Sequence, residues 1–257
     1  MTGAPALPPR CAGCRCGDDG PVSPVVAIVA HGQPGDPGAL QPEIEALAAS
    51  VSAALGGGIA VAGATLACPR SLARLAGIRA VYPLFMADGW FVRTEMPRRL
   101  AGAGVEGFAV LAPLGLDPAL PPIGAAIARQ AAADAGIAPA DATLVVVGHG
   151  SKGARASAES TRAFAAALPG GAGFAAVEVA LLEEPPFLSV FRATGPAVCL
   201  PFFATAGGHT TEDIPEGWDE AGAPGPIALP LGTTPAIPAL IAAAIKEWMA
   251  AQAASRP

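Results

Sequence analysis

Histidine is rare in this chain, and each of its three histidines stands in a glycine-containing loop. His149 comes directly after the strand-like apolar run 144–147, and His209 follows a glycine pair. A further strand-like run ends at Glu183 and Glu184, before two prolines. Two imidazoles and a carboxylate that converge could hold a divalent metal ion with open coordination positions. The same groups could equally accept protons beside a substrate.

The loop that carries His149 also fits a second template. Residues 148–153 read GHGSKG, which satisfies the G-x-G-x-x-G pattern of dinucleotide-binding proteins, and Glu178 lies where a ribose-binding acid would stand. The corresponding segment earlier in the chain begins with Ala30 and keeps its histidine, His31. The earlier segment thus lacks the first glycine of the pattern but keeps the histidine. This difference favours a functional histidine over a pyrophosphate-binding loop.

The sequence repeats itself at a constant offset. His31 and His149 lie 118 positions apart, and the segment 83–89 returns as 201–207 at the same offset. Two motifs that hold one offset indicate two tandem copies of one ancestral unit.

The two copies differ in the residues that could do chemistry. The second has His209 where the first has Phe91, and Glu183 where the first, after a two-residue gap, has Ala67. We therefore expect the second copy to be catalytic and the first to be degenerate. The predicted organisation is a Gly- and Pro-rich tail at 1–23, a degenerate half at 24–138 and a catalytic half at 139–252.

Strand-like apolar runs alternate with helical spacing along both halves. Strands are expected near 25–30, 59–66, 79–84, 107–112, 143–148, 174–181, 197–201 and 226–229, and helices near 39–55, 70–76, 92–103, 118–134, 155–167, 186–192, 209–220 and 234–251. This order predicts an α/β fold of two tandem doubly wound parallel-sheet domains with a cleft between them. In such sheets ligands bind beyond the carboxyl ends of the strands, where both His-Gly motifs fall.

The composition narrows the class of protein. Apolar residues make up 52% and charged residues 14% of the chain, enough for a folded core. The net charge of −6 gives no basis for binding nucleic acid, and we expect neither a membrane span nor a secretory signal. A cytoplasmic protein is the default expectation.

Three of the five cysteines, Cys11, Cys14 and Cys16, are clustered in the N-terminal tail. Three thiolates in six residues could bind a soft metal or an iron–sulfur cluster. The alternative is a dispensable tail, which is the interpretation we favour because the segment has no apolar periodicity with which to pack.

Several motifs together resemble the sirohydrochlorin chelatases, which are class II tetrapyrrole chelatases. They are the His-Gly-Ser after the first strand of the second half, the sequence LEEP at 182–185, and PFFATAGGHTTEDIP at 201–215. The resemblance covers about residues 24–250 and is most specific over 144–215.

The resemblance implies a lyase that inserts cobalt, iron or nickel into sirohydrochlorin, in cobalamin or sirohaem biosynthesis, without an organic cofactor. His149 and His209 would bind the metal and accept protons, and Glu183, or its neighbour Glu184, would assist metal delivery. His31 would at most line the cleft. Histidine suits this chemistry because imidazole takes up protons near neutral pH. The alternative is a carrier on the same fold that binds metal or tetrapyrrole without turnover, and the chain could be a monomer or a homodimer.

Sirohydrochlorin carries carboxylates that need cationic or amide partners. Backbone amides of Ser151–Gly153 at a helix start, with Lys152 and Arg155, would receive them. Gly207 and Gly208 would let the backbone approach the ligand closely. Four aromatic residues could flank a flat macrocycle or belong to the core: Trp90, Phe91, Phe202 and Phe203.

Overall fold

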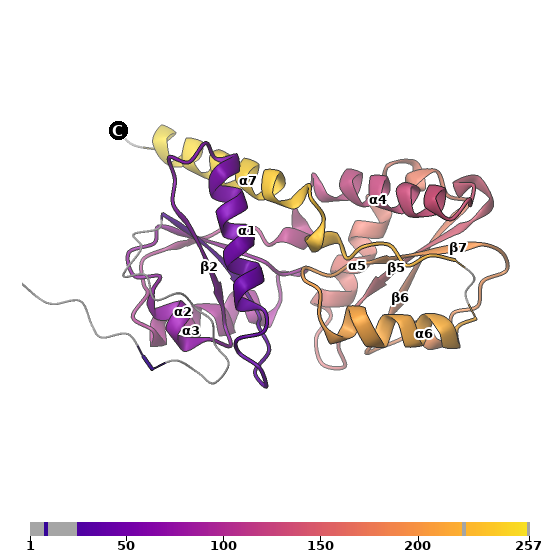
Figure 1. Ribbon diagram of the computed structural model, residues 1–257, viewed down its shortest axis with the longest axis horizontal. Coiled ribbons are helices and arrows are strands. Elements are labelled where there is room, and N and C mark those ends of the chain that lie inside the picture. The colour runs from indigo at the N-terminus through magenta and orange to yellow at the C-terminus, as the bar shows by residue number, and fades with distance from the viewer. Residues whose placement is uncertain (1–7, 10–24, 223–224, 256–257) are drawn as a thin grey trace, which may run out of the picture. The chain divides into compact units, whose positions relative to one another are not determined.

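The computed structural model describes residues 8–9, 25–222 and 225–255, and the tail cysteines Cys11, Cys14 and Cys16 lie outside them. The chain forms two compact units (Figure 1). Unit 1 consists of Met1–Leu84, Trp90–Pro113 and Pro238–Pro257, and unit 2 of Phe85–Gly89 and Leu114–Ile237.

Unit 1 is built on a parallel sheet with the strand order β2-β1-β3-β4. The strands are β1 (Val26–Ala30), β2 (Val61–Thr65), β3 (Ala80–Pro83) and β4 (Ala109–Val110), and the helices are α1 (Gln41–Ala54), α2 (Pro69–Ala73) and α3 (Met96–Gly102). Every residue of β1 is buried, as expected for a central parallel strand with both faces covered.

Helix α1 completes the outer edge of this sheet with a side chain. The amide of Gln41 donates to the carbonyl of Gly63 at 3.0 Å and accepts from the Thr65 N–H at 3.0 Å, so that it imitates a neighbouring strand. Gly63 has no room for a side chain, because a Cβ there would lie 2.4 Å from the carbonyl oxygen of Ile44. The free edge of β2 is thus paired locally.

Unit 2 repeats the pattern with the strand order β6-β5-β7, again all parallel. Its strands are β5 (Thr143–Gly148), β6 (Ala176–Leu181) and β7 (Ala197–Pro201), and its helices are α4 (Leu120–Asp134), α5 (Ala156–Ala166) and α6 (Ile214–Glu220). Helix α6 covers one face, where Ile214 and Trp218 pack with Val145 and Cys199.

The last helix of each half packs in the other unit. Helix α4 follows the first sheet in sequence but belongs to unit 2, where Gly124 lies against the ring of Phe164. Helix α7 (Ile237–Ala254) follows the second sheet but lies in unit 1, where the guanidinium of Arg79 stacks over Trp248 at 5.5 Å. The predicted halves 24–138 and 139–252 are therefore not the two compact units.

Most predicted elements agree with the structure, and four differ. The strand expected at 226–229 is reduced to a bridge between Cys199 and Ile227, and the helix expected at 186–192 is the single 3₁₀ turn η5 (Leu188–Val190). The helices expected at 92–103 and 209–220 each begin with a π-helical turn. These turns are η1 (Phe91–Glu95) and η6 (His209–Asp213), and the remaining short 3₁₀ segments are η2 (Leu114–Leu116), η3 (Pro139–Asp141), η4 (Pro169–Gly173) and η7 (Leu231–Thr233). Within the described residues no helix combines the length and the apolar character that a membrane crossing needs.

Candidate active site

The loop after β5 holds His149 between two glycines that the packing requires. A Cβ at Gly148 would lie 2.1 Å from Oγ1 of Thr161 on α5. Gly150 has φ +73°, a left-handed conformation that glycine adopts without strain. The close packing of α5 and the turn at Gly150 together direct the His149 side chain out of the carboxyl end of β5.

The π-helical turn η6 presents His209. The turn starts after Gly207, whose carbonyl accepts the Thr210 N–H at 2.8 Å and the Thr211 N–H at 3.0 Å. Nδ1 of His209 donates to Oδ2 of Asp213, four residues on, at 2.5 Å. This carboxylate fixes the ring orientation and leaves Nε2 of His209 with its lone pair.

The two imidazoles meet edge to face. Nε2 of His149 lies 3.1 Å from Nε2 of His209, with ring centroids 4.5 Å apart at 86°. Nδ1 of His149 lies 2.8 Å from the carbonyl oxygen of Gly150, which can only accept, so this nitrogen carries the proton. In the neutral pair both Nε2 atoms are acceptors, and the space between them suits a cation, either a metal ion or a proton.

The spacing of the pair fits two neighbouring ligands of one metal ion. With metal–nitrogen bonds of about 2.0–2.1 Å, nitrogens 3.1 Å apart subtend an angle of about 98° at the metal, between octahedral and tetrahedral values. Within residues 25–222 and 225–255, no group of three or more His, Cys, Asp or Glu side chains is arranged to hold a metal ion. Among the described residues the histidine pair thus has no third His, Cys, Asp or Glu side chain arranged with it as a ligand.

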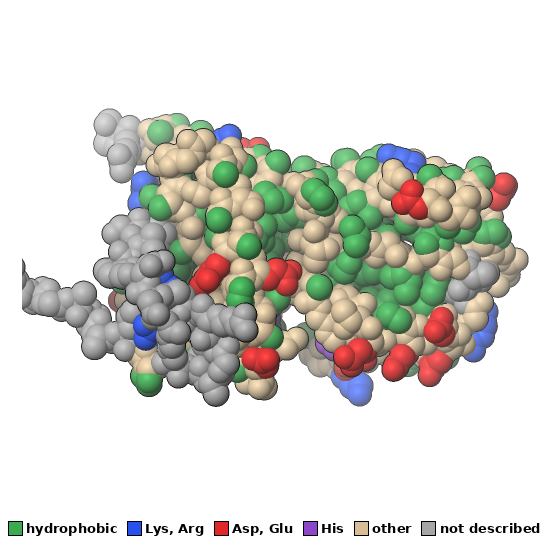
Figure 2. Space-filling model, viewed as in Figure 1, with side chains coloured by type: hydrophobic (Ala, Val, Ile, Leu, Met, Phe, Trp, Pro, Cys, Tyr) green, Lys and Arg blue, Asp and Glu red, His purple; other side chains and the backbone are tan. Residues whose placement is uncertain are grey.

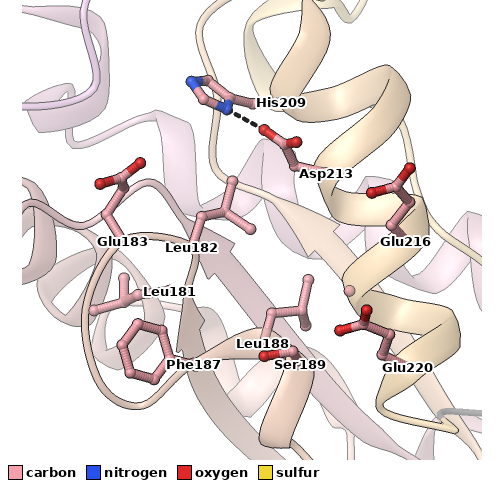
Figure 3. Close-up of a pocket in the computed structure, with 11 residues that line it drawn as sticks. Leu181, Leu182, Glu183, Phe187, Leu188, Ser189, His209, Asp213, Glu216 and Glu220 are labelled. Atoms are coloured by element: carbon pink, nitrogen blue, oxygen red, sulfur yellow. Dashed lines mark hydrogen bonds and ion pairs between the residues drawn. The ribbon is translucent and has the colours of Figure 1, made fainter.

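The two glutamates at the end of β6 do different things. Oε1 of Glu184 accepts the Ser151 N–H at 2.9 Å, so Glu184 holds the loop that carries His149. Glu183 instead lines a pocket together with His209, and its own N–H donates to the His149 carbonyl at 2.9 Å. Figure 3 shows Glu183 across this pocket from Asp213. Glu183 is thus the carboxylate available to a ligand.

This pocket, of about 310 Å³, is rich in carboxylates. Glu183 lies on one side, and Asp213, Glu216 and Glu220 follow each other along η6 and α6 on the other (Figure 3). Figure 2 shows acidic side chains gathered over α6. The apolar floor is formed by Leu181, Leu182, Phe187 and Leu188. The pocket beside His209 therefore gathers four carboxylates, an arrangement that attracts cations.

The amides of the 150–153 loop are mostly engaged within the protein. Gly150 N donates to Ser157 Oγ at 3.1 Å, Ser151 N to Glu184, and Gly153 N to Ser151 Oγ at 3.4 Å. These amides hold the loop rather than stand open for a substrate anion, in contrast to the expectation from the sequence. Lys152 and Arg155 are exposed and remain the candidate partners for substrate carboxylates.

Unit 1 contains the same frame without the second imidazole. Gly32 has φ +75°, and Nδ1 of His31 lies 2.6 Å from the Gly32 carbonyl oxygen, as in unit 2. Phe91 stands against His31 with ring centroids 4.4 Å apart at 85°, nearly the geometry of the histidine pair. A phenyl ring cannot bind a metal or accept a proton, so unit 1 lacks the two-imidazole arrangement.

The aromatic residues named above divide into core and surface. Phe202 is buried and packs on Phe164, with ring centroids 4.7 Å apart. Phe203 lies 6.5 Å from the His149 ring and 6.2 Å from the His209 ring, whereas Trp90 and Phe91 are exposed.

Sequence reasoning missed the role of Asp213, although it noted the residue in the motif. The available signal was the i, i+4 spacing from His209, which places both side chains on one helical face. In unit 1 the corresponding acid is Glu95, which Arg98 and Arg99 bind at 2.7 and 2.6 Å. Hydrogen bonds from Arg98 and then Arg99 lower the pKa of Glu95 to about 2. The acid that orients a histidine in unit 2 is an ion-pair partner in unit 1.

Comparisons with known proteins show the family of this chain. The family model CbiX matches residues 143–248, which contain both histidines of the pair. The structure of CbiX described as the terminal enzyme for the biosynthesis of siroheme in denitrifying bacteria is 44% identical, with a TM-score of 0.78 over 86% of this chain and 98% of that chain. Comparison with curated protein sequences gave no significant match.

Two more distant structures share the fold. SirB from Bacillus subtilis with Fe³⁺ is 14% identical, with a TM-score of 0.67 over 91% of this chain and 98% of that one. DR2241 from Deinococcus radiodurans is 23% identical, with a TM-score of 0.64 over 86% of this chain and 55% of its own. Because identity of 44% extends over nearly the whole of the siroheme-pathway enzyme, this chain belongs to the CbiX family of sirohydrochlorin chelatases, the class II chelatases.

Proposed function

We propose that this protein inserts a divalent metal ion, cobalt or ferrous iron, into sirohydrochlorin, and that His149 and His209 carry out the insertion. The observation that carries this proposal is the 3.1 Å approach of Nε2 of His149 to Nε2 of His209, while an oxygen acceptor engages Nδ1 of each ring. An open two-imidazole site binds a metal ion and can also release it, whereas a closed four-ligand site would retain the ion.

The stoichiometry of the reaction matches the pair. Inserting M²⁺ into the free-base macrocycle forms bonds to the ring nitrogens and releases two pyrrole protons. As the metal leaves the imidazoles, each Nε2 regains a lone pair and can accept one of these protons. The carboxylate of Asp213 stabilises the imidazolium that would form at His209, because Nδ1 already donates to it.

Glu183 and the acidic pocket support the delivery of the cation. Glu183, Asp213, Glu216 and Glu220 surround a pocket of about 310 Å³ that contains His209 in its lining. A cleft lined with one sign of charge concentrates the opposite ion at the site. In this proposal Glu183 assists the arriving metal, and the histidine pair hands it to the macrocycle.

Iron is the first metal to test. The 44%-identical relative is described as the terminal enzyme of siroheme biosynthesis, and the siroheme macrocycle holds iron. Imidazole and carboxylate ligands accept Fe²⁺, Co²⁺ and Ni²⁺ alike, so the ligand set does not select one of them. A higher kcat/KM with Co²⁺ than with Fe²⁺ would favour cobalamin biosynthesis instead.

The test is anaerobic incubation of the purified protein with excess sirohydrochlorin and Fe²⁺, Co²⁺ or Ni²⁺, followed by absorbance and corrected for insertion without protein. We expect many turnovers per protein molecule. A spectral change that stops at one equivalent would show a carrier rather than an enzyme, and no change with any metal would refute the proposal.

A further inference from the structure

Two aromatic side chains of unit 1 are exposed side by side. Trp90 is 56% and Phe91 is 38% exposed, and their ring centroids lie 5.1 Å apart at 71°. Phe202, which follows β7, is buried in the core. Trp90 and Phe91, which follow β3, are not. Adjacent exposed aromatic rings mark surfaces that bind a partner or ligand.

These rings occupy the position that carries the chemistry in unit 2. Phe91 corresponds to His209 at the offset of 118, and it faces His31 as His209 faces His149. Both residues also begin a π-helical turn, η1 in unit 1 and η6 in unit 2. Unit 1 has thus kept the frame of the site and replaced a metal ligand with an aromatic surface.

The charge of the corresponding helical segments is opposite. Segment 89–104 carries three arginines, Arg93, Arg98 and Arg99, and one carboxylate, Glu95. Segment 207–222 carries no lysine or arginine and five carboxylates, which are Glu212, Asp213, Glu216, Asp219 and Glu220. The second segment suits a metal cation, and the first suits an anion.

The arginines of unit 1 are held in place but keep hydrogen-bond donors. Arg98 donates from Nε and Nη2 to Glu95, while Arg99 donates from Nε to Glu95 and from Nη1 to the Leu66 carbonyl. Each guanidinium has five N–H donors, so both retain others. Their side chains are 66% and 40% exposed. Glu95 therefore orients two cationic groups toward solvent.

We propose that Trp90, Phe91, Arg98 and Arg99 form a tetrapyrrole-binding surface on unit 1, with the aromatic rings stacking on the macrocycle and the guanidiniums binding its carboxylates. This inference rests on the proposed function for the identity of the ligand. A planar ring with several carboxylates is the ligand that matches exposed aromatic rings and exposed arginines within one short segment, residues 90–99.

Binding of metal-free sirohydrochlorin, measured by equilibrium dialysis, tests this surface. Trp90→Ala should raise the dissociation constant for sirohydrochlorin about 5- to 10-fold, with Co²⁺ affinity unchanged. Trp90→Phe should restore most of the binding, because it keeps an aromatic face. Arg98→Gln should weaken binding at low salt and much less at high salt, because an exposed charge pair is screened.

Leu229→Ala is the matched control, because Leu229 is 60% exposed and lies in unit 2. It should bind sirohydrochlorin like the wild type. If Trp90→Ala also binds like the wild type, the surface is wrong even though turnover by the wild type would still support the proposed function. If the wild type binds sirohydrochlorin through Trp90 but turns over no metal, the surface stands and the proposed function fails.

Discussion

Nε2 of His149 and Nε2 of His209 face each other at 3.1 Å, although the residues are 60 positions apart in the chain. The Gly150 carbonyl and the Asp213 carboxylate engage the two Nδ1 atoms, so both imidazoles present their other nitrogen to one point. In unit 1 the ring of Phe91 takes the same position against His31. One frame therefore supports a two-nitrogen site in unit 2 and an aromatic contact in unit 1.

Replacing either imidazole should abolish most metal insertion. His149→Ala and His209→Ala should each reduce kcat by about 10²- to 10⁴-fold, because each removes a ligand and a proton acceptor. Circular dichroism should show an intact fold, since His209 is exposed. His31→Ala should cause a much smaller loss. Near-normal turnover of both unit 2 variants at saturating metal would contradict the assignment.

Asp213 should act through His209 rather than on the metal directly. Asp213→Asn should lower Co²⁺ affinity about 10- to 100-fold, because the neutral amide holds the ring less firmly and lowers the basicity of Nε2. Titration followed by the visible spectrum of bound Co²⁺ measures this. Asp219→Asn is the control, since Asp219 is exposed on helix α6, which follows directly after η6, and does not line the pocket. Equal affinities for the two variants would exclude an orienting role for Asp213.

Substitutions of the neighbouring acids Glu183 and Glu184 should have different effects. Those at Glu183 should change the rate of metal insertion, and those at Glu184 should change thermal stability. Glu183→Gln should slow insertion mainly at low metal concentration, because Glu183 lines the pocket without holding the loop. Glu184→Ala should lower the melting temperature, because the Ser151 N–H loses its acceptor. Glu184→Gln keeps an acceptor oxygen and should melt close to the wild type. The assignment of metal delivery to Glu183 fails if Glu183→Gln leaves the rate unchanged at every metal concentration.

The ion pairs of Glu95 should make the stability of unit 1 depend on pH in the acid range. Arg98 and Arg99 hold the pKa of Glu95 at about 2 in the folded state, below its ordinary 4.5. The stabilisation is therefore complete above about pH 4.5 and is lost as the pH falls toward 2. Thermal melts should show Glu95→Gln below the wild type at pH 7, with the difference shrinking as the pH falls from about 4.5 toward 2.

Glu159→Gln is the control for that series, because Glu159 is an exposed acid on α5. Its difference from the wild type should be small at every pH. A gap between wild type and Glu95→Gln that stays constant down to pH 2 would show that the two arginines do not set the charge state of Glu95.

The sequence alone predicted the parallel α/β elements and the tandem repeat, because periodicity and a constant offset are local properties of the chain. It failed at 226–229 and 186–192, where short apolar runs carry too little information to separate a strand or helix from a bridge or turn. It also missed the exchange of α4 and α7 between the units, since an amphipathic helix does not specify in sequence which sheet it covers.

For the site, the sequence determined which residues could bind a metal, because only a few side chains offer a suitable lone pair and three histidines are easily found. The tertiary structure decided their use. It brought His149 within 3.1 Å of His209, directed Glu184 to a backbone amide and left Glu183 in the pocket. These contacts depend on the backbone direction at the ends of three strands. Residues that are adjacent in sequence share that direction, but their side chains point to opposite sides, so the sequence alone does not say which one reaches the site.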